Sequence, residues 1–394
     1  MSLEINGYLL KDGLKTENAG MCRWGFGEKD GQSYFVKEFL SPKYPVNEEL
    51  LGPEMTQRMK EVACNYYKER SAFYNKLREC RTGNIVVVEE FFRHGAKYYA
   101  VTDRIVGNLL EIEDIARRNA EKKRVLTLSL LYSMATLHKA GIVHSDLKPE
   151  NILIKDTANG FCTAKIIDFD AGFFETDQPT EIEGSQNYFS PEAVRKMNGA
   201  AVQVTRKADV FALGLLLHQY WTGKMPSFAS NYHYACEALL HDSPLNVSAD
   251  IPGDIREVIA RMLSKNPEDR PTAWSAWNYI SGASKTLEIE KPRPAVADTA
   301  EADTAEAIKE NKPEEKTLTK EAVVDAETAF QKLEYEVSLA PDDVSISAGK
   351  KEDPQDSTAD EKAAPESNPD DVVAELFAKY LISGMDAAGE DKGR

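Results

Sequence analysis

The chain has 394 residues and a formal net charge of −17, so it exceeds the size at which one hydrophobic core keeps growing and should contain more than one folding unit. Residues 285–394 contain 14 basic and 28 acidic residues and hold −14 of this charge, which leaves −3 for the first 284 residues. Because there is no sustained basic stripe to displace counterions, we do not expect nucleic acid as a main partner.

The cysteines and the apolar segments indicate the compartment. Five cysteines are scattered without Cys-x-x-Cys spacing, which is typical of a reducing compartment. The N-terminus does not resemble a signal segment, and the longest apolar stretch, residues 210–217, is too short to span a bilayer. These features predict a cytoplasmic protein without membrane contact.

The first hundred residues have the pattern of a small antiparallel sheet. Short β-rich segments are separated by turn residues, with a turn at residues 28–31. The expected strands are residues 8–10, 21–24, 33–39, 86–92 and 97–102.

A helix is expected between these strands, at residues 53–80, because apolar residues recur there at helical spacing. Residues 41–49 precede it and have the composition of an inserted loop. A passive surface insertion is the favoured interpretation, and contact with a partner is the alternative.

A second helix is predicted at residues 109–137. Residues 138–141 close it with a basic last turn and a C-cap glycine. This helix would deliver the stretch that follows it.

That stretch reads His-Ser-Asp-Leu-Lys-Pro-Glu-Asn at residues 144–151, and Asp-Phe-Asp follows at 168–170. Short apolar runs of strand character flank both. The acid, the lysine and the asparagine can converge only if a loop folds them onto one point, and phosphoryl transfer needs such a set. Asp146 would orient the attacking hydroxyl, Lys148 would offset the moving charge, and Asn151 and Asp168 would supply oxygen ligands for magnesium.

Beyond residue 284, Ala, Glu, Asp, Pro and Lys dominate the composition. Such a segment cannot bury enough apolar surface to offset chain entropy, so we expect a mostly disordered acidic tail at 285–394. Residues 322–339 are weakly helical, and a short helix is expected at 371–383. Its apolar stretch, Val372 to Ile382, either docks on a partner or on the rest of the chain, or stays a loose nascent helix.

With these motifs, the chain resembles the eukaryotic-type Ser/Thr protein kinases, whose loops read H-R-D-x-K-x-x-N and D-F-G. Residues 184–192 resemble the family's substrate-positioning segment, and residues 209–214 resemble the start of its buried central helix. Arg270 matches the arginine that the family pairs with Glu192. Small-molecule kinases share the catalytic residues but lack this set. The resemblance covers roughly residues 8–283.

The resemblance implies an α+β, bilobal protein-kinase fold. A small antiparallel-sheet N-lobe with one main helix would span 1–103, and a larger, mostly helical C-lobe would span 104–284. The implied function is transfer of the ATP γ-phosphoryl group to a protein hydroxyl, with ATP and Mg2+ as cofactors. Lysine at position 148 is typical of the Ser/Thr enzymes.

Further site residues follow from the resemblance alone. Lys37 would hold the α- and β-phosphates and pair with a helix acid, for which Glu69 is the candidate and Glu61 the alternative. Gly20 is the remaining glycine of the phosphate-covering loop. Residues 103–107 would form the adenine-binding hinge, so Asp103 and Ile105 are candidates there, with Thr102 before them.

Several residues depart from the family pattern. Lys15 and Glu17 stand where the family has glycines, and Asp170 stands where it has the glycine of D-F-G. Phe35 points to the same face as Lys37 and either stacks on the adenine or excludes it. These departures support the alternative function, a pseudokinase that acts as a nucleotide-binding or scaffolding module.

Ser145 replaces the arginine of H-R-D, which in the family pairs with a phosphate on the activation loop. A phosphate on Thr176 or Thr180 would lack this partner and would lie among acidic residues. We therefore expect activity that does not require activation-loop phosphorylation.

Overall fold

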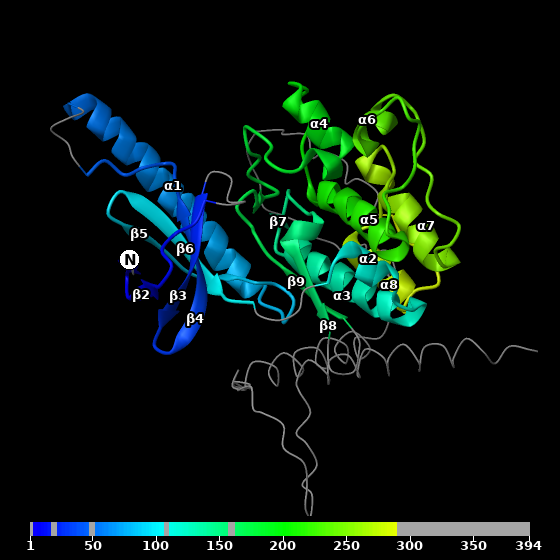
Figure 1. Cartoon of the computed structure of the whole chain (residues 1–394). Coiled ribbons are helices and arrows are strands. Elements are labelled where there is room, and N and C mark those ends of the chain that lie inside the picture. The colour runs from blue at the N-terminus through cyan, green and yellow to red at the C-terminus, as the bar shows by residue number, and fades with distance from the viewer. Residues whose placement is uncertain (1–2, 17–21, 47–51, 106–109, 157–161, 290–394) are drawn as a thin grey trace, which may run out of the picture.

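The computed structural model describes residues 3–16, 22–46, 52–105, 110–156 and 162–289. In these residues, a sheet with one long helix is followed by a larger, mostly helical region (Figure 1). The predicted bilobal fold is confirmed. Residues 290–394 of the predicted acidic tail, with its helices at 322–339 and 371–383, lie outside the described residues.

The N-lobe sheet has six antiparallel strands in the order β1-β2-β3-β4-β6-β5. In chain order they are β1 (Leu3–Ile5), β2 (Tyr8–Leu10), β3 (Cys22–Lys29), β4 (Gln32–Phe39), β5 (Val88–His94) and β6 (Lys97–Asp103). The sequence did not predict β1. Its antiparallel pairing with β2 defines it.

Alternation along the strands divides the sheet into two faces. Tyr8, Leu10, Val36 and Val101 are buried in a small core on one face. Lys37 lies on the other face, because its neighbour Val36 points away from it.

The long helix α1 (Pro53–Glu79) confirms the prediction at 53–80, and proline occupies its first turn, where the missing N–H costs nothing. Its buried stripe includes Ala63, Phe73, Tyr74 and Leu77. The N-terminal turns of α1 extend beyond the sheet (Figure 1). The described part of the inserted loop is tied to the sheet by Tyr44, whose N–H donates to the Ala96 carbonyl at 2.8 Å.

The C-lobe begins with two helices, α2 (Ile112–Ala116) and α3 (Ala120–Lys139), where the sequence predicted one. The break follows from Asn119, whose side chain accepts the Lys122 N–H and caps α3. The lobe continues with β7 (Ile142–Val143), β8 (Ile152–Asp156), β9 (Cys162–Ile166), β10 (Phe173–Phe174), α4 (Pro191–Met197), α5 (Arg206–Thr222), α6 (Ala235–Leu240), α7 (Gly253–Met262) and α8 (Ala273–Ile280).

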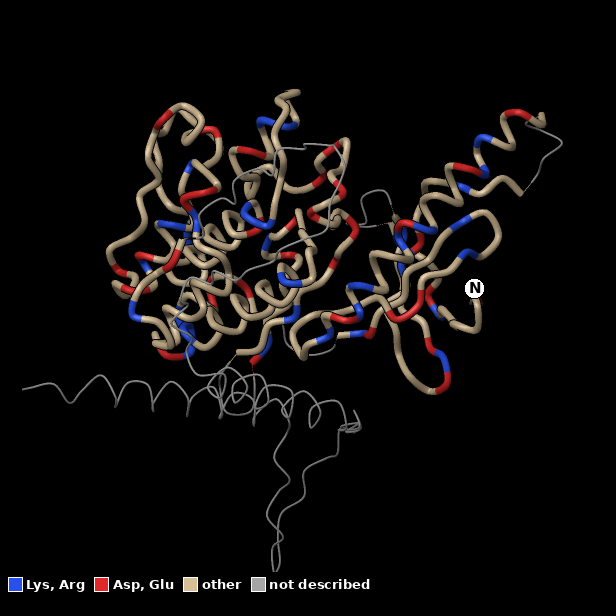
Figure 2. The backbone as a smooth tube through the Cα atoms, turned by 180° about the vertical axis from the view of Figure 1, so that it is seen from behind, with Lys and Arg blue, Asp and Glu red and all other residues tan. Residues whose placement is uncertain are grey.

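Helix α5 is buried on nearly all sides and forms the centre of the C-lobe, as the motif at 209–214 indicated. It ends at Gly223, whose φ of 78° is the left-handed conformation of a helix C-cap. Within the described ranges, none of the helices combines the length and the apolar composition of a membrane span. Acidic and basic residues are interspersed along both lobes (Figure 2).

Candidate active site

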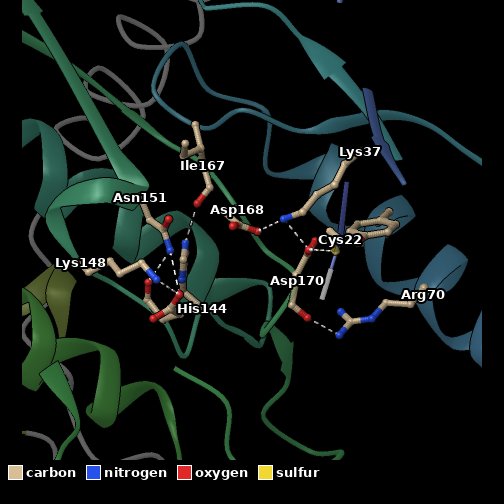
Figure 3. A network of polar contacts seen from close by, with 11 residues as sticks. Cys22, Lys37, Arg70, His144, Lys148, Asn151, Ile167, Asp168 and Asp170 are labelled. Carbon is tan, nitrogen blue, oxygen red and sulfur yellow. Dashed lines mark hydrogen bonds and ion pairs between the residues drawn. The ribbon is translucent and has the colours of Figure 1, made fainter. Parts of the chain in front are cut away.

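The catalytic loop follows β7 and ends in a short 3-10 turn at Pro149–Asn151. The Lys148 ammonium lies 2.6 Å from Oδ2 of Asp146. The Asn151 amide donates to the Asp146 carbonyl at 2.8 Å and to its Oδ2 at 3.1 Å. The structure therefore brings together the three loop residues that the spacing had singled out. Figure 3 shows Lys148 and Asn151 beside His144.

Asp209 of α5 holds this loop in place. Its carboxylate accepts the backbone N–H groups of His144 and Ser145, each at 2.9 Å, and contacts His138 at 3.1 Å. Ser145 has a φ of 70°, a strained conformation for a non-glycine residue, which these bonds stabilise. The sequence motif at 209–214 does not by itself indicate this role of Asp209. The signal was a carboxylate inside a buried apolar helix, since such a group needs hydrogen-bond partners.

The Asp-Phe-Asp loop lies against the catalytic loop. The Ile167 N–H donates to the Asn151 carbonyl at 3.0 Å, and the His144 ring contacts the Ile167 carbonyl at 3.1 Å. Phe169 is buried beneath the His144 ring, with ring centroids 4.8 Å apart. Asp168 also has a positive φ, 60°. These contacts set Asp168 beside Asn151.

Lys37 reaches this loop from β4. Its ammonium lies 2.9 Å from Oδ1 of Asp168 and 2.6 Å from Oδ2 of Asp170 (Figure 3). Burial alone would lower the pKa of Lys37, but the two carboxylates outweigh it and raise that pKa. Burial alone would raise the pKa of Asp168, but the charge of Lys37 and its hydrogen bond hold that pKa below its usual value. For Asp170, burial and the Asp168 charge prevail, and its pKa is raised.

The predicted partner of Lys37 on the helix was wrong. Glu69 is exposed, and so is the alternative, Glu61. Arg70 instead points at the Asp-Phe-Asp loop. One residue along an α-helix is a rotation of about 100°, and Arg70, not Glu69, lies in the middle of the buried stripe of α1.

Only part of the predicted nucleotide site is described. Gly20, Glu17 and hinge residues 106 and 107 lie outside the described residues. Asp103 ends β6 and is exposed, and Ile105 follows it half-buried. Thr102 lies opposite Phe35 in the β4–β6 ladder.

Phe35 packs into a cluster of aromatic side chains on the Lys37 face of the sheet. Its ring stacks on Trp24 with centroids 5.8 Å apart, and it meets Phe26 edge-on at 6.0 Å. The Arg104 guanidinium lies 4.1 Å from the centre of the Phe26 ring. Lys15 pairs with Trp24 through two backbone hydrogen bonds of 2.7 and 2.9 Å.

The substrate-positioning segment is anchored as predicted. The Arg270 guanidinium donates to both oxygens of Glu192, at 2.7 and 2.8 Å. Upstream of Glu192, Gly184 packs against the catalytic loop, where an added Cβ would lie 3.0 Å from the Ser145 carbonyl oxygen and 2.7 Å from Phe189. Oδ1 of Asp146 is buried here without a hydrogen-bond partner among the described residues.

Comparisons with known proteins agree with this geometry. The model of the protein kinase domain matches residues 56–279, more than half of the chain. Serine/threonine-protein kinase pkn3 of Myxococcus xanthus is 31% identical over 163 residues, which cover 38% of this chain and 28% of the relative. Serine/threonine-protein kinase ksg1 of Schizosaccharomyces pombe is 30% identical over 194 residues, covering 44% and 31%.

A probable myosin light chain kinase of Dictyostelium discoideum is 26% identical over 207 residues, covering 50% of this chain and 64% of the relative. The chain thus matches less than two thirds of the length of each of these relatives. The family match and the catalytic constellation lead to one conclusion: the chain belongs to the eukaryotic-type Ser/Thr protein kinase family.

Proposed function

We propose that the protein is an active Ser/Thr protein kinase that transfers the γ-phosphoryl group of ATP to a hydroxyl of a protein substrate. One observation carries the proposal: Lys148 and Asn151 both contact the Asp146 carboxylate, and Asp168 of the adjoining loop is paired with Lys37. Phosphoryl transfer depends mainly on positioning and on charge stabilisation, and this set provides both.

Each catalytic-loop residue has a role that suits its surroundings. Asp146 holds Lys148 and Asn151 through Oδ2, which leaves Oδ1 to accept a hydrogen bond from the substrate hydroxyl. Lys148 offsets the charge of the transferred group. Gly184 lets the substrate-positioning segment approach Asp146 closely.

The residues present fit magnesium and ATP. Asn151 and Asp168 supply the few oxygen ligands that Mg2+ takes from protein when phosphates and water complete its coordination. When bound, the metal would offset charge on the phosphates. Lys37 would hold the phosphates, Gly20 would lie in the phosphate-covering loop, and Asp103 and Ile105 would meet the adenine edge through their backbone.

The test is phosphorylation by purified protein with labelled ATP and magnesium. Asp146→Asn and Asp168→Ala should each lose activity with little change in the melting temperature, because both act outside the core. Asp177→Asn is the matched control, since Asp177 is an exposed carboxylate in the activation segment, the stretch around Thr176 and Thr180 that follows the Asp-Phe-Asp loop. Equal label incorporation by wild type and Asp146→Asn would refute the proposal.

A second candidate, a pseudokinase with a nucleotide-binding or scaffolding role, is favoured by the packing of Phe35 and by the glycine-poor phosphate loop. This candidate predicts that the protein binds either nucleotide or only a protein partner, and that no label is transferred to a substrate in either case. Parallel titration with a fluorescent ATP analogue separates this candidate from the active kinase.

The cellular setting is also part of the proposal. We place the kinase in the cytoplasm, acting on protein substrates, with residues 372–382 as a docking peptide for a partner. Deleting residues 371–394 should then weaken phosphorylation of the partner while phosphorylation of a short generic peptide stays unchanged.

A further inference from the structure

Asp170 places a carboxylate on the ammonium of Lys37, although the family has a glycine at this position. The Lys37–Asp170 contact, at 2.6 Å, is shorter than the Lys37–Asp168 contact, at 2.9 Å. The glycine of the loop comes two residues later. An added Cβ on Gly172 would lie 2.7 Å from Phe73, so Gly172 provides the close approach to α1.

Helix α1 holds the Asp170 side chain in this position. Arg70 donates one hydrogen bond to the Asp170 carbonyl and another to the Gly172 carbonyl, the latter at 3.0 Å. The Tyr74 hydroxyl donates to Oδ1 of Asp170 at 3.4 Å, while Oδ2 faces Lys37. The N-lobe therefore holds Asp170 twice, through Arg70 at its backbone carbonyl and through Lys37 and Tyr74 at its carboxylate; Figure 3 shows Arg70 and Lys37 on either side of it.

The charges around Lys37 explain why a second acid is needed. If Asp168 serves the metal, it can no longer neutralise Lys37, which is only 17% exposed and requires a partner. Glu69 is exposed and does not provide one. Asp170 remains beside Lys37 and is available throughout.

We propose that Asp170 is the positioning residue that orients Lys37 toward the phosphates, in place of a glutamate from the helix. The charges of the family arrangement are exchanged: the helix supplies a cation, Arg70, to the loop, and the loop supplies the anion to Lys37. The inference rests on the proposed kinase function for its kinetic consequence, while the Lys37–Asp170 pair itself is testable without nucleotide.

The first test measures Lys37 in the nucleotide-free protein. Only the neutral amine reacts with an N-hydroxysuccinimide ester. Because the pairing with Asp170 favours the charged ammonium, it should slow the acetylation of Lys37, which mass spectrometry measures. Asp170→Asn keeps the shape and removes the charge, and should speed this reaction by about threefold or more. Asp177→Asn should match wild type. Unchanged labelling of Lys37 in Asp170→Asn would overturn the proposal, whether or not the protein is a kinase.

The second test separates positioning from mere folding. Asp170→Asn should lower kcat/KM for ATP by about 100-fold, the cost of a misplaced group near the chemistry. Asp170→Glu, which retains the charge, should recover most of that loss. A rate equal to wild type or higher in Asp170→Asn would mean that Asp170 is idle or restrains Lys37, and either result overturns the proposal. Absence of activity in wild type contradicts the proposed function instead, and the labelling result then stands alone.

Discussion

The side-chain amide of Gln178 pairs with the backbone of Val204 as a neighbouring strand would. Its oxygen accepts the Val204 N–H at 2.9 Å, and its nitrogen donates to the Val204 carbonyl at 2.9 Å. The same nitrogen donates to the Glu175 carbonyl at 3.0 Å. Glu175 in turn accepts from the backbone N–H of Arg206 at 3.0 Å. A neutral side chain thus ties the activation segment to the loop before α5.

This tie leads to a prediction about phosphorylation. Ser145 has no positive charge, and its hydroxyl donates to the Glu183 carbonyl at 3.2 Å. Since the segment is already held without a phosphate, a Thr176→Ala, Thr180→Ala double variant and phosphatase-treated wild type should both phosphorylate an exogenous protein within about threefold of untreated wild type, below roughly 1 kcal/mol of barrier. A loss of about a hundredfold would contradict the prediction and would indicate that another basic residue, such as the exposed Arg195, replaces the missing arginine.

Removing the Gln178 side-chain amide should lower activity, unlike removing the two threonines. Gln178→Leu has nearly the same shape but leaves the Val204 N–H and two carbonyls without their partner, at a cost of about 1–3 kcal/mol for each buried unsatisfied group. We expect slower phosphorylation and faster cleavage of residues 175–185 by protease. Glu181→Gln is a control at an exposed position of the same segment, outside the tie. Equal cleavage rates for wild type and Gln178→Leu would contradict the prediction.

The Glu192–Arg270 pair predicts a large effect on stability. Arg270 is fully buried and also donates to the Lys207 carbonyl at 2.7 Å. Arg270→Met would leave Glu192 as an uncompensated buried charge, which costs about 3–5 kcal/mol. Denaturant unfolding should show this loss, whereas Arg261→Met, at an exposed position, should change little. A difference under about 1 kcal/mol between the two variants would show that Glu192 finds another partner.

His218 predicts how stability depends on pH. Its ring is buried, its Nδ1 contacts the Lys224 carbonyl at 2.7 Å, and its Nε2 accepts the Ser248 N–H at 3.1 Å. Burial lowers its pKa, against the opposing effect of the Lys224 hydrogen bond. At a pH between this lowered value and the ordinary pKa of about 6.5, the unfolded chain binds the proton and the folded chain does not.

Stability from His218 should therefore be complete above about pH 6.5 and fall as the pH drops below that value. The melting temperature of wild type should decrease as the pH is lowered from 8 to 5, and that of His218→Gln should decrease less. His94→Gln, at an exposed position, is the control. If His218→Gln and wild type lose the same number of degrees, another group is responsible.

The sequence by itself determined the local elements that carry the chemistry. The eight residues from His144 specify a catalytic loop because a proline and a fixed spacing leave few ways to fold them, and Asp146, Lys148 and Asn151 do converge. The alternation of side chains along β4 placed Lys37 on the other face of the sheet from its neighbour Val36. The apolar periodicity predicted the ends of α1 to within one residue.

The tertiary structure decided which of these elements are in contact, and which side of each helix faces its neighbours. The rotation of α1 about its axis, which turns Arg70 and not Glu69 toward the loop, depends on packing against the sheet and against the loop at Gly172, and a shift of one residue is invisible in a broad apolar stripe. Asp209 is 65 residues from His144 in the sequence, so its hold on the catalytic loop exists only after α5 is buried. Lys37 meets Asp170 for the same reason. The two residues lie 133 positions apart in the sequence and in different lobes, and only the packing of those lobes brings the charges together.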